Sequence, residues 1–265
     1  MGSPKPLASR YAGIVLDIDG VCVRGKSTIP GAPETVDELR KLGVGLAFAT
    51  NNASRTPAAV ADHLRDAGFI VDASEVVTSG QAAARLLAPG TRCLVIGMEG
   101  VREPLIERGC VITPDYTQAD AVVVGIDTDL TYEDLALATL AIGRGARFVG
   151  TNPDPSFPSE RGQIPGNGAI LAALRTATGV QAEVAGKPEA PLFEAAADRM
   201  PEGPLLMVGD RLDTDVQGAA ELGWDTALAL TGSTHRDMLA AATSAPTYVL
   251  ETIADLLELP TDMAG

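Results

Sequence analysis

The chain has 265 residues, of which 46% are hydrophobic and 21% are charged, so it is long enough for one large globular domain or two smaller ones. Its net charge of −15 argues against a surface that attracts nucleic acid or anionic membranes. Three unpatterned cysteines, no apolar signal region and no run of 18 apolar residues together predict a cytoplasmic protein without a disulfide framework.

Short apolar runs alternate with helix-like segments along the chain, as in parallel βαβ units. In chain order, we predict strands at 13–17, 45–49, 75–78, 92–96, 120–126, 146–150, 182–185, 204–209, 225–230 and 247–250. We predict helices between them at 32–43, 57–67, 80–88, 131–143, 167–178, 190–199, 214–222 and 235–242. This density of βα units predicts an α/β fold with a doubly wound parallel sheet.

The middle third of the chain carries its own βαβ pattern, and Pro/Gly breaks border it near Pro89-Gly90 and after Gly179. We therefore predict a core domain built from residues 1–88 and 182–265, with an α/β unit inserted at 89–181. Periodicity alone leaves one continuous sheet open as the alternative.

Two carboxylates follow the first strand, where the apolar run 14–16 stops at Asp17-Ile18-Asp19-Gly20. In an extended segment residues i and i+2 point to the same side, so both acids face the same space. Like charges a few ångströms apart repel by roughly 4 kcal/mol at an effective dielectric of about 20. The pair therefore needs a proton, a cation or full solvation.

Polar residues follow three further strands, at the end of the sheet where open α/β folds bind ligands. They are Thr50-Asn51-Asn52, then Lys187 between Gly186 and Pro188, and the acidic run Asp210, Asp213 and Asp215 beside Arg211. Each alone has an ordinary structural interpretation as a cap, a turn or a solvated lysine. Together with the two acids after the first strand, they predict an oxygen-rich pocket for a hard cation such as Mg²⁺, with donors for an anion.

These residues resemble the motifs of the haloacid dehalogenase superfamily of phosphotransferases, in the same chain order. The matching residues are Asp17-Ile18-Asp19-Gly20, Thr50, Lys187, and Gly209-Asp210 through Asp215. The stretches "DGVCVRGKSTIPGAPE", "TSGQAA", "TNPDPSFPSERGQIPGNGA", "GKPEAPLFE" and "GDRLDTDVQGA" resemble its branch of para-nitrophenyl phosphatases and of phosphoglycolate, glycerol 3-phosphate and pyridoxal phosphatases. The similarity runs from about residue 12 to residue 259.

The resemblance implies a Rossmann-like core with a large α/β cap inserted between the second and third motifs, and an aspartyl-phosphate mechanism. Asp17 would be the nucleophile and Asp19 the acid/base. Mg²⁺ would bind the Asp17 carboxylate, the Asp19 carbonyl and Asp210, with Asp215 supporting it through water. The phosphoryl group would be held by Thr50, Asn51, Asn52 and Lys187, the last also counted as catalytic.

The substrate implied is a small phosphorylated metabolite, and the cap loop "NPDPSFPSERG" supplies Asn152, Asp154 and Glu160 as candidates to contact its leaving group. A Pro-rich structural loop is the alternative interpretation of these three residues. Ser156-Phe157 stands where similar pyridoxal phosphatases have a Trp-His pair, which disfavours pyridoxal 5′-phosphate. A polar loop without an aromatic platform favours glycerol 3-phosphate.

Phosphoglycolate, pyridoxal phosphate and nucleoside monophosphates stay open as alternative substrates, and a homodimer stays open as the assembly. A catalytically silent binding protein on the same fold is the alternative from another functional class. A metal-independent dehalogenase would have no use for Asp19 as acid/base or for Asp210 and Asp215.

Overall fold

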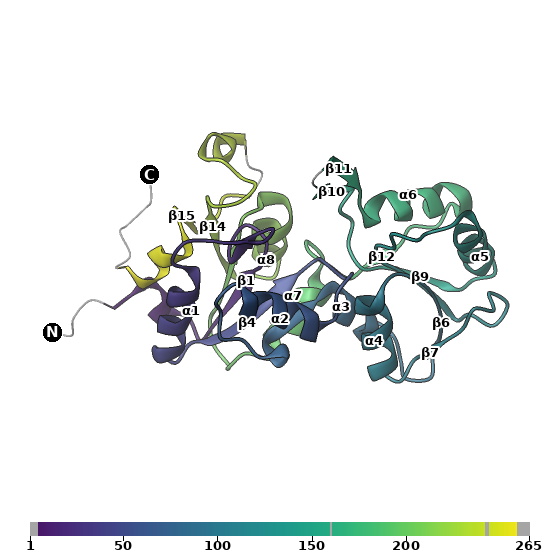
Figure 1. Cartoon of the computed structure of the whole chain (residues 1–265), viewed down its shortest axis with the longest axis horizontal. Helices are drawn as coiled ribbons and strands as arrows, with labels where there is room; N and C mark the ends of the chain where they lie inside the picture. The colour runs from purple at the N-terminus through teal and green to yellow at the C-terminus, as the bar shows by residue number, and fades with distance from the viewer. Residues whose placement is uncertain (1–4, 160, 242–243, 259–265) are drawn as a thin grey trace. The chain divides into compact units, whose positions relative to one another are not determined.

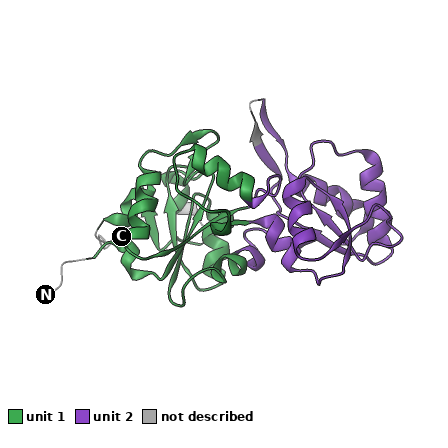
Figure 2. Cartoon of the chain, turned by 60° about the horizontal axis from the view of Figure 1, so that its bottom comes forward, with its two compact units in different colours: residues 1–50, 58–77, 193–265 green, residues 51–57, 78–192 purple. Residues whose placement is uncertain are grey.

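The computed structural model describes residues 5–159, 161–241 and 244–258, which form two compact units. Unit 1 comprises residues 1–50, 58–77 and 193–265, and unit 2 comprises residues 51–57 and 78–192, as coloured in Figure 2. Each unit has its own sheet, so the alternative of one continuous sheet is wrong. The predicted α/β fold with a parallel core sheet and a separate α/β unit is confirmed.

Unit 1 is built on a six-stranded sheet in the order β15-β14-β13-β1-β4-β5. Figure 1 labels β15, β14, β1 and β4 of this sheet. Its strands are β1 (Gly13–Asp17), β4 (Gly45–Thr50), β5 (Val76–Thr78), β13 (Leu205–Gly209), β14 (Asp225–Ala229) and β15 (Tyr248–Leu250). The central strand β1 pairs in parallel with β13 on one side and β4 on the other. All five residues of β1 are buried, because helices cover both faces of a doubly wound sheet.

Unit 1 contains several helical segments, and some of them bury aliphatic residues against this sheet. The segments are η1 (Leu7–Arg10), α1 (Ala32–Lys41), α2 (Pro57–Asp66), η2 (Ala73–Glu75), η3 (Leu212–Val216), α8 (Gln217–Glu221), η4 (Arg236–Ala241) and η5 (Ile253–Leu257), with α7 (Ala190–Ala197) crossing the unit boundary. Val36 and Leu39 of α1 and Leu64 of α2 belong to one buried cluster with Ile14 and Leu16 of β1. Because both helices bury their apolar faces against β1, this cluster fixes the position of the strand.

Unit 2 contains a five-stranded parallel sheet in the order β12-β9-β8-β6-β7. Its strands are β6 (Arg92–Ile96), β7 (Val111–Ile112), β8 (Ala121–Val124), β9 (Arg147–Gly150) and β12 (Glu183–Val184). Its helices are α3 (Ser79–Arg85), α4 (Glu99–Glu107), α5 (Tyr132–Gly143) and α6 (Asn167–Thr178). Residues of α5 and α6 form one buried apolar cluster with β6, β8 and β9.

Strand β12 pairs with β9, so the sheet of unit 2 includes residues beyond the predicted border at 181. The compact units divide at 78 and 192, and segment 51–57 also belongs to unit 2. The predicted domain borders at 89 and 181 stay predictions.

Some elements depart from the sequence pattern. The predicted helix at 214–222 is the π-helical turn η3 followed by the short α8, and the one at 235–242 is the 3₁₀ segment η4. No predicted range covers helix α4, and Pro104 inside it is normally a helix-breaking signal.

Two short hairpins were not predicted either. They are β2 (Val23–Arg24) with β3 (Ser27–Thr28), and β10 (Ser156–Ser159) with β11 (Gly162–Pro165). Strands of two to four residues carry too little alternation to be recognised in a sequence. Within the described part of the chain, no helix combines the length and the apolarity needed to span a bilayer.

Candidate active site

Three neighbouring strands of unit 1 end at the same edge of the sheet. Strand β1 ends at Asp17, β4 ends at Thr50, and β13 ends at Gly209, directly before Asp210. Because β1 lies between the other two and all three are parallel, their polar end residues gather at one edge. This placement is the one predicted for Asp17, Thr50 and Asp210.

The carboxylates of Asp17, Asp210 and Asp215 form a buried cluster, with ligand oxygens that lie within 4.8 Å of one another. Three negative charges at this separation repel strongly in a buried site unless a cation or protons compensate them. Carboxylate oxygens are the ligands that Mg²⁺ prefers. The donor set therefore fits a magnesium ion.

Asp210 is enclosed by backbone on two sides. Its Oδ2 accepts a hydrogen bond of 2.5 Å from Ser233 N–H, in the loop after β14. A Cβ on Gly232 would lie 2.0 Å from that oxygen, and a Cβ on Gly20 would lie 2.5 Å from Asp210 Cγ. Gly20 also has φ +93°, so glycine is required there twice over. Gly232 and Ser233 were not predicted as site residues, although they follow a strand at the same edge.

Asp215 reaches the cluster from the π-helical turn η3, which follows β13. Asp215 Oδ2 accepts a hydrogen bond from Arg211 N–H at 3.1 Å. A Cβ on Gly209 would lie 2.2 Å from the Asp215 Cβ. Asp213 was expected in the same pocket, but its side chain is 70% exposed and forms an ion pair with Arg211 at 2.9 Å. That guanidinium lowers the pKa of Asp213, and this acid lies outside the cluster.

Asp19 lies in the turn that follows β1 and is exposed, unlike Asp17. The turn is closed by hydrogen bonds from Cys22 N–H and Val23 N–H to Ile18 O and from Gly20 N–H to Val23 O. The Cys22 side chain contacts this turn, because its Sγ donates to Asp17 O at 3.4 Å. Burial, followed by the charges of Asp17 and Asp19, raises the pKa of the Cys22 thiol, which makes a reactive thiolate unfavourable.

A second group of predicted residues gathers in unit 2, around Lys187. Lys187 is 2% exposed, and its backbone N–H donates to Asn51 Oδ1 at 2.8 Å. Asn51 Nδ2 donates to Lys187 O at 2.9 Å and to Asp154 Oδ2 at 3.2 Å. Asn152 Nδ2 donates to Asn51 O at 2.7 Å, so the structure joins Asn51, Asn152, Asp154 and Lys187 in one network.

The last two candidates are Asn52 and Glu160. Asn52 is exposed, and its Oδ1 accepts from Ser54 N–H and Ser54 Oγ–H at 2.8 and 2.7 Å, which forms a local turn. Glu160 lies outside the described residues.

Two buried residues of unit 2 support this network and were not assigned a role from sequence. Ser79 Oγ donates to Asn51 O at 2.6 Å. Asn167 Nδ2 donates to Asn152 O at 2.9 Å and to Val124 O at 3.2 Å, which holds the loop after β9. Both lie in stretches that carried the family resemblance, but a resemblance over a stretch does not tell which side chain bonds to which loop.

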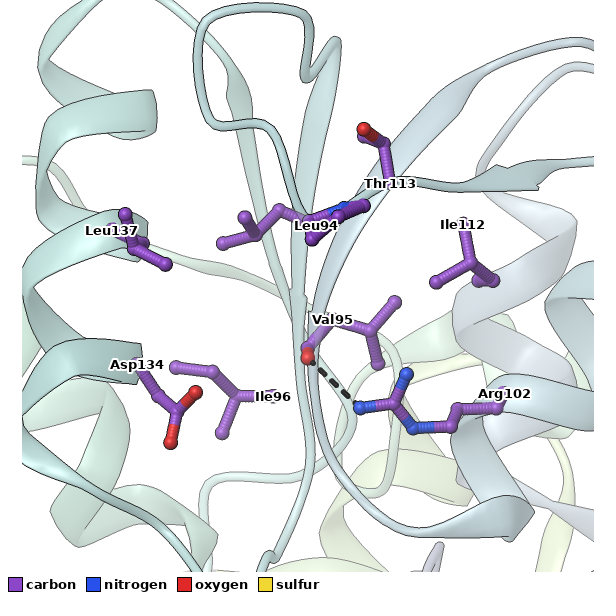
Figure 3. A pocket seen from close by; sticks show the side chains of 9 residues that line it. Leu94, Val95, Ile96, Arg102, Ile112, Thr113, Asp134 and Leu137 are labelled. Carbon is purple, nitrogen blue, oxygen red and sulfur yellow. Dashed lines mark hydrogen bonds between the residues drawn. The ribbon is translucent and has the colours of Figure 1, made fainter.

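Unit 2 also contains a cavity of about 330 Å³, and no predicted site residue lines it (Figure 3). Its lining residues are Leu94, Val95, Ile96, Arg102, Ile112, Thr113, Pro114, Asp134 and Leu137. Asp134 already caps α5 through Thr131, and Arg102 donates to backbone carbonyls. Its carboxylate and its guanidinium are thus engaged in structural hydrogen bonds, so we assign the cavity no catalytic role.

Known protein families match both ends of the chain. Residues 14–111 match the family described as haloacid dehalogenase-like hydrolase, and residues 184–256 match a related family of the same kind of hydrolases. Among curated proteins, the chain is 40% identical to D-glycerol 3-phosphate phosphatase of Mycobacterium tuberculosis, over 92% of this chain and 70% of the relative. It is 39% identical to 5′-nucleotidase YutF of Bacillus subtilis, over 92% of this chain and 97% of the relative.

Among solved structures, the chain is similar to a crystal structure of glycerol phosphate phosphatase from Mycobacterium tuberculosis in complex with magnesium. The TM-score is 0.91 at 38% identity, and the match covers 96% of this chain and 79% of that chain.

Proposed function

Because the chain belongs to the haloacid dehalogenase-like hydrolases and is a phosphatase of small phosphorylated metabolites, we propose that it works through an aspartyl-phosphate on Asp17, with glycerol 3-phosphate as its substrate. The buried cluster of Asp17, Asp210 and Asp215 at the end of β1 is the observation that carries the mechanism.

The acidic cluster is the proposed magnesium site. Asp17 and Asp210 would bind Mg²⁺ directly together with the Asp19 carbonyl, and Asp215 would support it. When bound, the ion would neutralise the carboxylates and polarise the phosphoryl oxygens.

The two acids of the first motif divide the chemistry between them. An Asp17 oxygen forms a bond to phosphorus while the bond from phosphorus to the ester oxygen breaks, and Asp19 gives its proton to that leaving oxygen. Asp19 then takes a proton from the water that attacks phosphorus, which releases phosphate and restores the Asp17 carboxylate. In this proposal Thr50, Lys187 and the turn at Asn51-Asn52 hold the phosphoryl group during both steps.

The choice of glycerol 3-phosphate is supported by the D-glycerol 3-phosphate phosphatase relative and by the polar cap loop around Asp154. The nucleotidase relative, at 39% identity, makes a nucleoside monophosphate the second candidate. Asn152, Asp154 and Glu160 stay predictions as residues that contact the leaving group.

A panel of phosphate esters tests the substrate. With Mg²⁺ present, kcat/KM is measured for glycerol 3-phosphate, phosphoglycolate, pyridoxal 5′-phosphate and nucleoside monophosphates. We expect glycerol 3-phosphate to rank first, and a value no better than the panel average would rule it out. No phosphate release from any ester would instead support a binding protein on this fold.

The Asp17→Asn variant tests the nucleophile. We expect kcat to fall by about 10⁴-fold or more, because an amide oxygen does not replace an attacking carboxylate. The melting temperature without Mg²⁺ should not fall, because the variant removes one charge from a repulsive cluster. A folded Asn variant with near-normal turnover would refute the assignment.

A further inference from the structure

The side-chain amide of Asn51 pairs with both backbone groups of Lys187. Its Nδ2 donates to Lys187 O at 2.9 Å, and its Oδ1 accepts from Lys187 N–H at 2.8 Å. This two-bond pattern is the one that a neighbouring β-strand makes with a residue. The amide therefore holds the peptide groups on both sides of the Lys187 Cα.

The second N–H of the same amide is also used inside the protein. Asn51 Nδ2 donates to Asp154 Oδ2 at 3.2 Å, in the loop that leads to the hairpin β10–β11. A primary amide has two N–H donors, and the two acceptors Lys187 O and Asp154 Oδ2 account for both. While these bonds persist, the Asn51 side chain has no N–H to offer a phosphoryl group.

The backbone of Asn51 is held as firmly as its side chain. Its carbonyl accepts from Ser79 Oγ at 2.6 Å and from Asn152 Nδ2 at 2.7 Å, and both donors are buried. The amide is therefore presented to Lys187 from a fixed support.

Gly186 provides an independent indication that this pairing requires close approach. A Cβ on Gly186 would lie 2.6 Å from Asn51 Oδ1 and 2.5 Å from Thr151 O. Both distances are shorter than real Cβ contacts, so any larger residue at 186 must displace the amide or the loop.

We propose that Asn51 is a positioning residue that acts through Lys187: its amide fixes the Lys187 backbone and thereby aims the buried ammonium group at the transferring phosphoryl group. This inference rests on the proposed function, in which Lys187 contacts that group. It replaces the expectation that the Asn51 side chain itself binds phosphate, and any direct contact would have to come from the Asn51 backbone N–H.

A double-mutant cycle tests the inference with p-nitrophenyl phosphate and saturating Mg²⁺. Asn51→Ala should lower kcat/KM on the order of 10²-fold, as expected for a misplaced catalytic group. If Asn51 acts through Lys187, the double variant Asn51→Ala/Lys187→Ala should be no slower than Lys187→Ala alone, within about twofold. Losses that multiply would show that Asn51 contacts the substrate or acts elsewhere, and would overturn the inference.

The same cycle is repeated on the dissociation constant of inorganic phosphate, measured by titration calorimetry with Mg²⁺, in case Lys187→Ala is too slow to assay. The losses in phosphate affinity should likewise fail to add, and additive losses would overturn the inference. An inactive wild-type protein that binds no phosphate would overturn the proposed function and the inference with it. An active wild type with multiplying losses would overturn the inference alone.

Two further variants separate positioning from loss of fold. Gly186→Ala should reproduce the loss seen in Asn51→Ala and, like it, add nothing to Lys187→Ala. Gln118→Ala removes an exposed amide that donates to Asp115 elsewhere in unit 2, and it should leave kcat/KM unchanged. Melting temperatures of all variants are compared by circular dichroism, and only variants that unfold cooperatively enter the cycle.

Discussion

Asp210 shows how single residues shape the acidic cluster. Its carboxylate lies against the backbone of Gly20 and Gly232 and accepts a hydrogen bond from Ser233 N–H, so its position is fixed before any ion binds. Its negative charge remains close to those of Asp17 and Asp215. Like charges about 4 Å apart repel by about 4 kcal/mol at an effective dielectric of about 20. Without a bound cation, the repulsion within this cluster therefore lowers the stability of the folded protein.

Bound magnesium and the substitution Asp210→Asn should consequently both relieve this repulsion and raise the melting temperature. We expect Mg²⁺ to raise the melting temperature of the wild type by several degrees, since 1 kcal/mol corresponds to about 2–4 °C in a chain of this size. Asp210→Asn keeps an acceptor for Ser233 N–H, and it should raise the melting temperature in EDTA and abolish the magnesium-induced shift.

Asp213→Asn is the matched control for this measurement, because Asp213 is exposed and paired with Arg211. It should retain the full magnesium-induced shift. An unchanged shift in Asp210→Asn would show that the ion binds elsewhere.

At the scale of elements, strand β6 of unit 2 has a partly open edge. Strand β7 pairs only with Arg92 and Cys93 of β6, so the second half of β6 extends past its neighbour. Arg102 of α4 covers this edge: its Nη2 donates to Val95 O at 3.3 Å (Figure 3). Its Nε donates to Gly97 O at 3.1 Å. A charged side chain over an exposed strand edge also opposes pairing with other chains.

Arg102→Ala should therefore destabilise the protein and promote self-association. We expect a loss of about 1–3 kcal/mol in the free energy of unfolding, from two hydrogen bonds to carbonyls, measured by urea denaturation. Light scattering should show association rising with concentration. Arg175→Ala, at an exposed position of α6, serves as the control, and identical behaviour of the two variants would contradict the role of Arg102.

At the scale of the whole molecule, the chain has a net charge of −15, and its substrate, a phosphate ester, is also negatively charged. A long-range field of this sign slows the approach of a phosphate dianion, and in the proposed mechanism Mg²⁺ and Lys187 oppose that field locally. The predicted cytoplasmic location and the homodimer stay predictions.

Added salt should accordingly speed the capture of substrate. Raising NaCl from about 10 mM to about 150 mM shortens the screening length from about 30 Å to about 8 Å. With Mg²⁺ saturating throughout, we expect kcat/KM to rise about twofold or more while kcat stays constant. A salt effect confined to kcat would contradict this electrostatic origin.

Much of the fold was predictable because buried parallel strands carry continuous apolar runs and end at polar residues. Strands β1, β4 and β13 were recognised for this reason, and so were Asp17, Thr50 and Asp210 at their ends. No predicted range covers helix α4, in which Pro104 contradicts the local pattern, and the hairpin β10–β11 was missed because local alternation is absent. Ser233 was missed because it contributes a backbone N–H, which no residue type marks in a sequence.

By itself, the sequence determined the class of fold, the family and the motif residues, since strand ends and motif spacing are local features of the chain. Only the tertiary structure decided which neighbouring acids converge. Asp215 joins Asp17 in the cluster while Asp213 faces solvent, because the π-helical turn η3 sends residues two positions apart in different directions. The tertiary structure also decided that Asn51 pairs with Lys187, because that contact joins residues 136 positions apart. Such a pairing depends on how two loops approach each other, which neither loop encodes alone.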